Sequence, residues 1–154
     1  MKDTMMTYHK MNDTKGLFQI ALGVMLFGIG GFIYLAFRST SLKMFEWCRQ
    51  LGVYNYILQI RNALHSINLN DFFLFSLPDG LWVTAYIIIV DFIWCKNCRM
   101  QLLWGCLLPV VGLCSELLQG LGFVNGTFDV MDILCYTIPY IIYLTFKLSK
   151  NEEI

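Results

Sequence analysis

A run of 21 residues without a formal charge, residues 17–37, limits what this chain can fold into more than any other feature. At a rise of about 1.5 Å per residue, a helix of this length crosses the roughly 30 Å hydrocarbon core of a bilayer. The run continues directly into Arg38 with no small-residue cleavage site, so we expect an uncleaved membrane-spanning helix. The whole chain of 154 residues is 57% hydrophobic and only 14% charged, which also favours a bilayer over water as its solvent.

Three further apolar stretches follow along the chain, at about 79–95, 100–122 and 129–146. Ser76, Pro78 and Asp79 form a helix-start pattern ahead of the first of these stretches. Pro109 and Pro139 lie inside the other two, where each removes a backbone hydrogen bond and predicts a kink. The predicted fold class is therefore all-α, an integral membrane bundle of four transmembrane helices.

The segment between the first two spans, residues 38–76, is too long to be a bare loop in a compact domain. Its second half repeats apolar residues at helical spacing, at Val53, Ile57, Ile60, Leu64 and Ile67. The stretch 42–51 mixes Phe45 and Trp47 with charged residues and ends just before Gly52, which suits a membrane surface. We therefore expect one or two interfacial amphipathic helices here.

These expectations divide the chain into five parts, which are an N-terminal tail (1–16), a first transmembrane helix (17–37), an interfacial amphipathic segment (38–76), a three-helix transmembrane region (77–147) and a C-terminal tail (148–154). With four spans, both termini and the connection near residue 97 lie on one side of the membrane. That side carries seven Lys and Arg residues, against four on the other side. The positive-inside rule then predicts a multi-pass protein of the cell (inner) membrane with both termini cytoplasmic.

Polar side chains inside the spans are the candidate functional residues, because an ionisable group in hydrocarbon normally faces the bundle interior, a partner or water. Glu116 and Gln119 are three residues apart, as are Asp129 and Asp132, so each pair shares a helix face. The turn that follows the third span brings these two pairs together near the outer surface. The predicted polar site consists of Glu116, Gln119, Asp129, Asp132, Asp79 and Tyr136.

Such a group of carboxylates could act as an acid and base pair, or could bind a cation or a polar headgroup. The alternative is structural: Asp129 and Asp79 lie near predicted helix starts, where carboxylates cap helices and hydrogen-bond between spans. No residue of this group is assigned a catalytic role.

Two runs in the same region resemble the signature of VanZ-like membrane proteins, namely residues 115–119 (SELLQ) and 125–134 (NGTFDVMDIL). That signature has a glutamate and a glutamine near the end of one span, a short loop, and an aspartate that opens the next span. The resemblance extends over roughly residues 77–144, with Asp79 and Tyr86 loosely matching an earlier aspartate and tyrosine of the family.

This chain differs from the family pattern at three places. It has Tyr136 where the family usually has an asparagine and Asn125 where the family usually has a basic residue, and it has no histidine near Trp82. The resemblance implies a shared fold and a role in the cell envelope. The founding member of the family is associated with low-level resistance to the glycopeptide antibiotic teicoplanin.

Three functions follow as hypotheses. The first is a VanZ-like envelope protein whose outer-facing acidic site binds a lipid-linked or headgroup-bearing ligand. The second is a membrane thiol-disulfide oxidoreductase, because Cys95 and Cys98 form a CxxC pair. The third is a non-enzymatic subunit or scaffold whose glycine-rich first span (Gly23, Gly28, Gly30, Gly31) packs on another membrane protein or a second copy of the chain.

Composition narrows the partners further. Eleven basic and eleven acidic residues leave no positive field for nucleic acid, so we expect none as a partner and expect membrane lipid instead. Neither His9 nor His65 has the companion ligands that a zinc site needs, so we predict no metal and no cofactor.

Overall fold

The computed structural model describes residues 2–95 and 97–152, and the regular structure in these residues is helical. The elements in chain order are α1 (Lys2–Phe37), α2 (Lys43–Gln50), α3 (Tyr54–Ala63), the π-helical turn η1 (Phe72–Ser76), α4 (Leu77–Ile93), α5 (Cys98–Gly105), α6 (Leu107–Gly120) and α7 (Val130–Glu152). Four stretches of the described chain are long and apolar enough to cross a membrane: Thr14–Phe37, Phe72–Ile93, Cys98–Gly120 and Val130–Ser149. The predicted all-α bundle of four membrane-spanning helices is thus confirmed.

The two expected tails differ from what the structure contains. Residues 2–16 are helical and continuous with the first span in α1, and α7 continues to Glu152. The ends of these tails, residues 1 and 153–154, lie outside the described residues.

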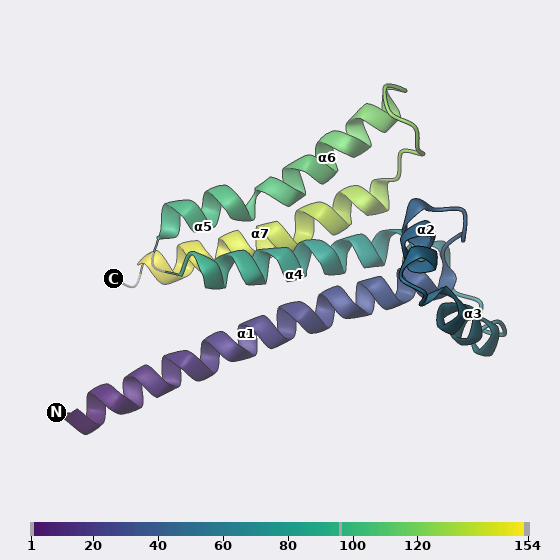
Figure 1. Cartoon of the computed structure of the whole chain (residues 1–154). Coiled ribbons are helices and arrows are strands. Elements are labelled where there is room, and N and C mark those ends of the chain that lie inside the picture. Colours follow the sequence, from purple (N-terminus) through teal and green to yellow (C-terminus); the bar gives the residue numbers. More distant parts are fainter. Residues whose placement is uncertain (1, 96, 153–154) are drawn as a thin grey trace.

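Helix α4 is the centre of the bundle, with α1 packed along one side and α7 along another, while α5 and α6 pack against α4 and α7 (Figure 1). Three glycines spaced seven residues apart, Gly16, Gly23 and Gly30, bring α1 close to side chains of α4. Near Gly30, the indole Nε1 of Trp82 donates a hydrogen bond of 3.2 Å to the backbone oxygen of Phe27. Small residues therefore let these two helices approach closely, as in other membrane helix pairs.

The second span begins earlier than its sequence pattern indicates. We predicted that Ser76 caps a helix start, and this is wrong, since its side chain makes no capping hydrogen bond. The helical backbone already runs through η1, where the N–H of Leu77 donates to the oxygen of Phe72. The turn instead starts at Asn70, whose Oδ1 accepts from the N–H of Phe72 at 3.3 Å.

Proline interrupts the third span but not the fourth. The third span is divided at Cys106 into α5 and α6, one turn before Pro109 (Figure 1). Pro109 has no N–H to donate to the oxygen of Gly105, which explains a break at this position. Pro139 lies inside α7, which nevertheless continues from Val130 to Glu152 without interruption.

The two short helices α2 and α3 lie beside the end of α1, at one end of the bundle (Figure 1). Phe45, Cys48 and Ile57 form a small buried core there, against the last turn of α1. Arg61 of α3 donates a hydrogen bond of 2.8 Å to the oxygen of Leu35, one of the last carbonyls of α1. An arginine here both satisfies that carbonyl and interacts favourably with the negative end of the helix dipole.

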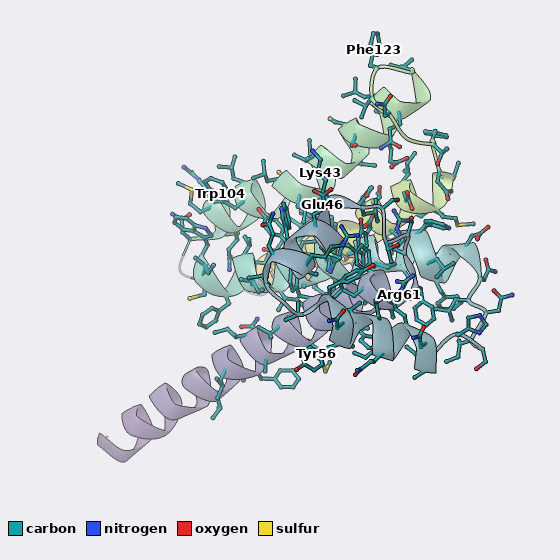
Figure 2. The ribbon with its side chains drawn as sticks, turned by 45° about the vertical axis from the view of Figure 1, so that its right-hand side comes forward. Lys43, Glu46, Tyr56, Arg61, Trp104 and Phe123 are labelled. Carbon is teal, nitrogen blue, oxygen red and sulfur yellow. The ribbon has the colours of Figure 1, made fainter. Side chains whose placement is uncertain are left out.

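Helices α2 and α3 are amphipathic, with one apolar face buried and one polar face exposed, which suits an interfacial location. Lys43 and Glu46 of α2 and Tyr56 of α3 are exposed (Figure 2). The apolar stripe predicted for α3 is shorter than expected: Ile57 is buried, whereas Ile67 lies beyond the end of the helix at Ala63.

Candidate functional site

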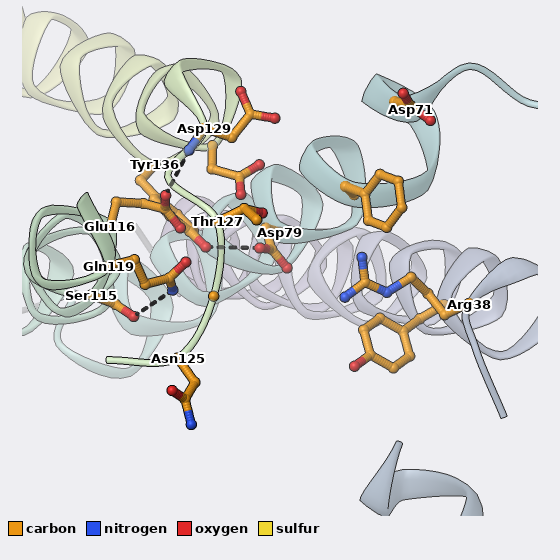
Figure 3. Close-up of a pocket in the computed structure, with 14 residues that line it drawn as sticks. Arg38, Asp71, Asp79, Ser115, Glu116, Gln119, Asn125, Thr127, Asp129 and Tyr136 are labelled. Carbon is orange, nitrogen blue, oxygen red and sulfur yellow. Dashed lines mark hydrogen bonds between the residues drawn. The ribbon is translucent and has the colours of Figure 1, made fainter. Parts of the chain in front are cut away.

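A cavity of about 470 Å³ opens at the end of the bundle that α2 and α3 occupy. Its walls come from the end of α1, the start of α4, the end of α6, the α6–α7 loop and the start of α7 (Figure 3). The lining residues are Tyr34, Arg38, Asp71, Phe75, Asp79, Ser115, Glu116, Gln119, Asn125, Gly126, Thr127, Asp129, Asp132 and Tyr136. All six residues predicted for the polar site are among them, together with one basic residue.

The α6–α7 loop is shaped by a glycine. Gly122 has a φ of +78°, and the N–H groups of Gly122 and Phe123 donate to the oxygens of Gln119 and Leu118 at 3.0 and 2.9 Å. This is the Schellman arrangement, which ends a helix and turns the chain back. As a result the start of α7 lies beside the end of α6.

Glu116 is the most deeply buried acid of the cavity, with 3% of its surface exposed. Its Oε2 accepts a hydrogen bond of 3.1 Å from the backbone N–H of Asp129, which ties α6 to the start of α7. Asp129 in turn caps α7, because its Oδ1 accepts from the N–H of Met131 at 2.8 Å. The capping role considered for Asp129 is therefore present, and its carboxylate still lines the cavity.

Asp79 does not cap a helix. Its Oδ2 accepts a hydrogen bond of 2.7 Å from the hydroxyl of Tyr136 on α7 (Figure 3). Gly112 of α6 makes room for the Tyr136 ring, since a Cβ at this position would lie 2.8 Å from the ring. The tyrosine thus links α4 and α7.

Asp132 and Gln119 complete the acidic wall. The Oδ1 atom of Asp132 is buried and has no hydrogen-bond partner among the described residues. The amide of Gln119 donates to the hydroxyl of Ser115 at 3.3 Å. Gly126 lies directly against the Gln119 side chain, so a Cβ at position 126 would require this side chain to move.

Arg38 is the basic residue that the sequence analysis did not place in the site. Its guanidinium lies over the rings of Phe75 and Tyr34, at 4.6 and 5.1 Å from their centroids. Within the described part of the chain it makes no side-chain hydrogen bond and no ion pair. Periodicity could not assign Arg38 to the cavity, because Phe75, on which its guanidinium stacks, lies far away in the sequence.

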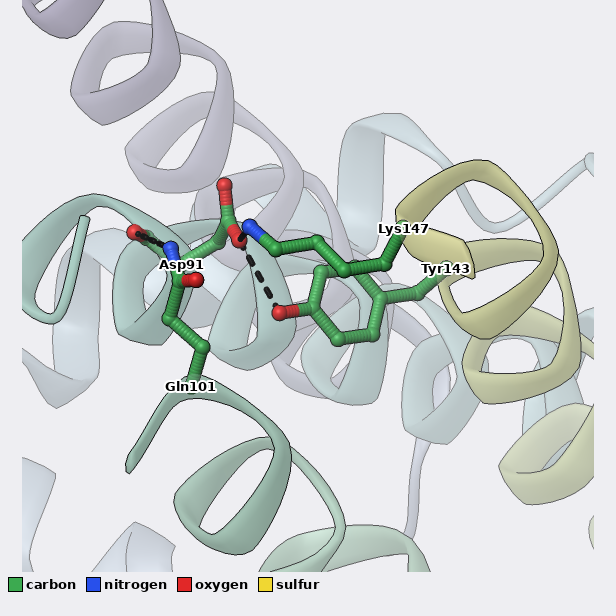
Figure 4. A network of polar contacts seen from close by, with 4 residues as sticks. All are labelled: Asp91, Gln101, Tyr143 and Lys147. Carbon is green, nitrogen blue, oxygen red and sulfur yellow. Dashed lines mark hydrogen bonds and ion pairs between the residues drawn. The ribbon is translucent and has the colours of Figure 1, made fainter. Parts of the chain in front are cut away.

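A second polar cluster lies near the other end of α4 (Figure 4). The Oδ1 atom of Asp91 accepts from the hydroxyl of Tyr143 at 2.9 Å and forms an ion pair with Lys147 at 2.7 Å. The side-chain amide of Gln101 donates to the backbone oxygen of Asp91 at 2.9 Å. This cluster joins α4, α5 and α7, and it gives Asp91 a structural role that the sequence did not indicate.

The CxxC pair lies at the connection between α4 and α5, at the opposite end of α4 from the acidic cavity (Figure 1). Cys95 is exposed and Cys98 is half-buried, while Lys96 between them lies outside the described residues. The thiol pair and the acidic cavity are therefore separate features of the molecule.

The glycines of the first span divide into two groups. Gly23 and Gly30 face α4 within the chain, whereas Gly28 and Gly31 have no side chain or backbone of another element within 4 Å. Two of the four glycines considered for packing on a partner therefore pack against α4 within the same chain.

Comparison with protein-family models, with curated proteins and with solved structures found no match for this chain. Its fold and the geometry of its cavity therefore carry the functional argument. These define a multi-pass membrane protein with an acidic cavity between its helices.

The cavity is lined by five acidic residues, Asp71, Asp79, Glu116, Asp129 and Asp132. Its acids are spread around the walls, and among the described residues no three side chains of His, Cys, Asp or Glu converge as a metal site. A site of this kind suits an extended polar ligand that reaches several walls at once.

Proposed function

We propose that this protein is a VanZ-like cell-envelope membrane protein whose acidic cavity binds a lipid-linked or headgroup-bearing ligand. The burial of Glu116 carries the proposal: a carboxylate with 3% exposure lines a cavity of about 470 Å³ inside a membrane bundle. A carboxylate in such a place is costly unless it has a partner or a function. Its one hydrogen bond within the described chain, from the N–H of Asp129, leaves it able to contact a ligand.

The position of the cavity supports a ligand from the membrane surface. The cavity lies at one end of the bundle, next to the amphipathic helices α2 and α3, where a lipid headgroup would lie. With both termini cytoplasmic, as the distribution of basic residues predicts, this end faces outward.

The test is Glu116→Gln, which keeps the size of the side chain and an oxygen for the N–H of Asp129. Wild-type protein and the variant are purified in mild detergent, incubated with a total lipid extract of the expression host, and compared by native mass spectrometry. We expect a retained lipid or lipid-linked species on the wild type and its loss from Glu116→Gln, with helical content unchanged. Glu46→Gln, on the exposed side of α2, is the matched control and should behave as the wild type. Equal retention by all three proteins would contradict the proposal.

A further inference from the structure

The charges of the cavity are arranged in two parts. Carboxylates from α4, α6 and α7 form one wall, and Arg38 at the end of α1 faces them, with its guanidinium turned toward Asp79 (Figure 3). A fifth carboxylate of the lining, Asp71 just before η1, lies apart from this wall. Arg38 forms no ion pair with Asp79 or with another acid of the described chain, so the two parts are separated by the cavity itself.

Arg38 is held in place without using its hydrogen-bond donors. Phe75 lies 4.6 Å from the guanidinium and Tyr34 lies 5.1 Å from it, and Tyr34 is itself packed on Trp82 at 5.5 Å between ring centroids. Stacking on aromatic rings fixes the plane of a guanidinium and leaves its N–H groups at the edge. Those N–H groups are suited to the paired oxygens of a phosphate.

The acidic wall has unused acceptors. The buried Oδ1 of Asp132 has no donor among the described residues, which is unfavourable unless a ligand supplies one. Glu116, almost fully buried, lines the same wall. An ammonium group supplies three N–H donors and a positive charge, and so satisfies several carboxylate oxygens at once.

The aromatic rings decide which kind of ammonium fits. Quaternary ammonium groups are bound by aromatic faces, because they have no N–H to donate. In this cavity Phe75 and Tyr34 already stack on Arg38, and the hydroxyl of Tyr136 already donates to Asp79. The remaining charged groups of the lining are carboxylates, which favour a primary ammonium with its N–H donors.

We propose that the ligand of the cavity carries a primary ammonium and a phosphate close together, as ethanolamine phosphate does. The acidic wall, with Asp132 and Glu116, holds the ammonium, and Arg38 holds the phosphate. This inference rests on the proposed function and names the ligand class of the same site. The group can come from the headgroup of phosphatidylethanolamine or from free ethanolamine phosphate.

The experiment measures binding of single lipids to the purified full-length protein by native mass spectrometry. Phosphatidylethanolamine, phosphatidylcholine and phosphatidylglycerol with the same acyl chains are titrated separately, together with a long-chain primary amine that has no phosphate. We expect phosphatidylethanolamine to bind about tenfold more tightly than the other two phospholipids, because each of these lacks one of the two charge-assisted contacts. Equal binding of the three phospholipids would overturn the inference.

Variants separate the two halves of the ligand. Arg38→Gln should weaken phosphatidylethanolamine about tenfold and leave the amine unchanged, whereas Asp132→Asn should weaken both. Arg49→Gln is the matched control, because Arg49 also stacks on an aromatic ring, 4.8 Å from the centroid of Tyr54, but does not line the cavity. An equal loss from Arg49→Gln and Arg38→Gln would count against a phosphate contact in the cavity.

Added ethanolamine phosphate identifies the source of the group. If ethanolamine phosphate displaces phosphatidylethanolamine at a similar concentration, the free compound is the ligand. If it does not displace the lipid, the lipid headgroup is the ligand. Both results support the ligand class. A preference for phosphatidylglycerol that Glu116→Gln abolishes would overturn the ligand class while leaving the proposed function intact. If Glu116→Gln changes the binding of no lipid, the proposed function fails as well.

Discussion

Replacing Gly30 by alanine tests the contact on which the bundle is built. In the structure, a Cβ at Gly30 would lie 2.7 Å from Nε1 of Trp82 and 3.1 Å from the backbone oxygen of Pro78. Nonbonded carbon atoms prefer separations of about 3.5–4.0 Å, so α1 must move away from α4 or the Trp82 ring must turn. Either movement strains the 3.2 Å hydrogen bond from Trp82 to Phe27.

Two opposing effects determine how much Gly30→Ala changes the free energy of unfolding. Overpacking of a well-packed contact costs about 1–3 kcal/mol, while alanine in place of glycine inside a helix gains roughly 0.5–1 kcal/mol. At Gly31 a Cβ would meet nothing within 4 Å, so only the gain applies there. Gly30→Ala should therefore have a free energy of unfolding about 1–3 kcal/mol lower than Gly31→Ala.

The assay is reversible unfolding in mixed micelles, followed by helical circular dichroism, on the wild type and both variants. In a background in which Trp47, Trp94 and Trp104 are replaced by phenylalanine, the fluorescence of Trp82 gives a second, local readout of the same contact. Of the two positions, only Gly30 faces α4, so equal free energies of unfolding for Gly30→Ala and Gly31→Ala would contradict a close contact between α1 and α4 at this position.

Three further predictions concern polar contacts and topology. Tyr136→Phe should lower the free energy of unfolding by about 2 kcal/mol, because it removes a hydrogen bond of 2.7 Å to the carboxylate of Asp79. Tyr140→Phe loses only a 3.4 Å hydrogen bond to a backbone oxygen, so it should lower the free energy of unfolding by less in the same assay. A double-mutant cycle of Asp91→Asn and Lys147→Met should give a coupling of about 1 kcal/mol in that assay, because both side chains are about one-fifth exposed, and zero coupling would contradict the ion pair. Single cysteines at 125 and 97, in a cysteine-free protein in intact cells, should react with an impermeant thiol reagent at 125 only; the reverse pattern would invert the topology.

Much of the fold could be predicted from the sequence, because its signals are local. Apolar runs long enough to cross a bilayer predicted four spans, and Pro109 predicted the interruption between α5 and α6. The start of the second span was misplaced, because Ser76 fits a capping pattern while the helical backbone already begins at Asp71, just after Asn70. A π-helical turn has no sequence pattern that distinguishes it from the end of a loop.

The acidic half of the cavity could also be predicted, because Glu116 and Asp132 lie on helices joined by one short loop. The basic half could not. Arg38 reaches the cavity through the packing of α1 on α4 and through stacking on Phe75, and these are contacts between distant parts of the chain. The sequence assigned no role to Asp91 for a similar reason, because its partner Lys147 lies 56 residues away.

The carboxylates of three helices share one cavity that is open to polar ligands, and the electrostatics of this cavity can be measured directly. A single cysteine replaces Thr127, an exposed residue of the cavity wall, in a cysteine-free protein, and its rates of reaction with a cationic and an anionic methanethiosulfonate are compared. An acidic cavity concentrates cations, so we predict that the cationic reagent reacts faster, and that adding Asp132→Asn reduces this preference. Equal rates for the two reagents, or a preference unchanged by Asp132→Asn, would contradict an acidic cavity to which Asp132 contributes.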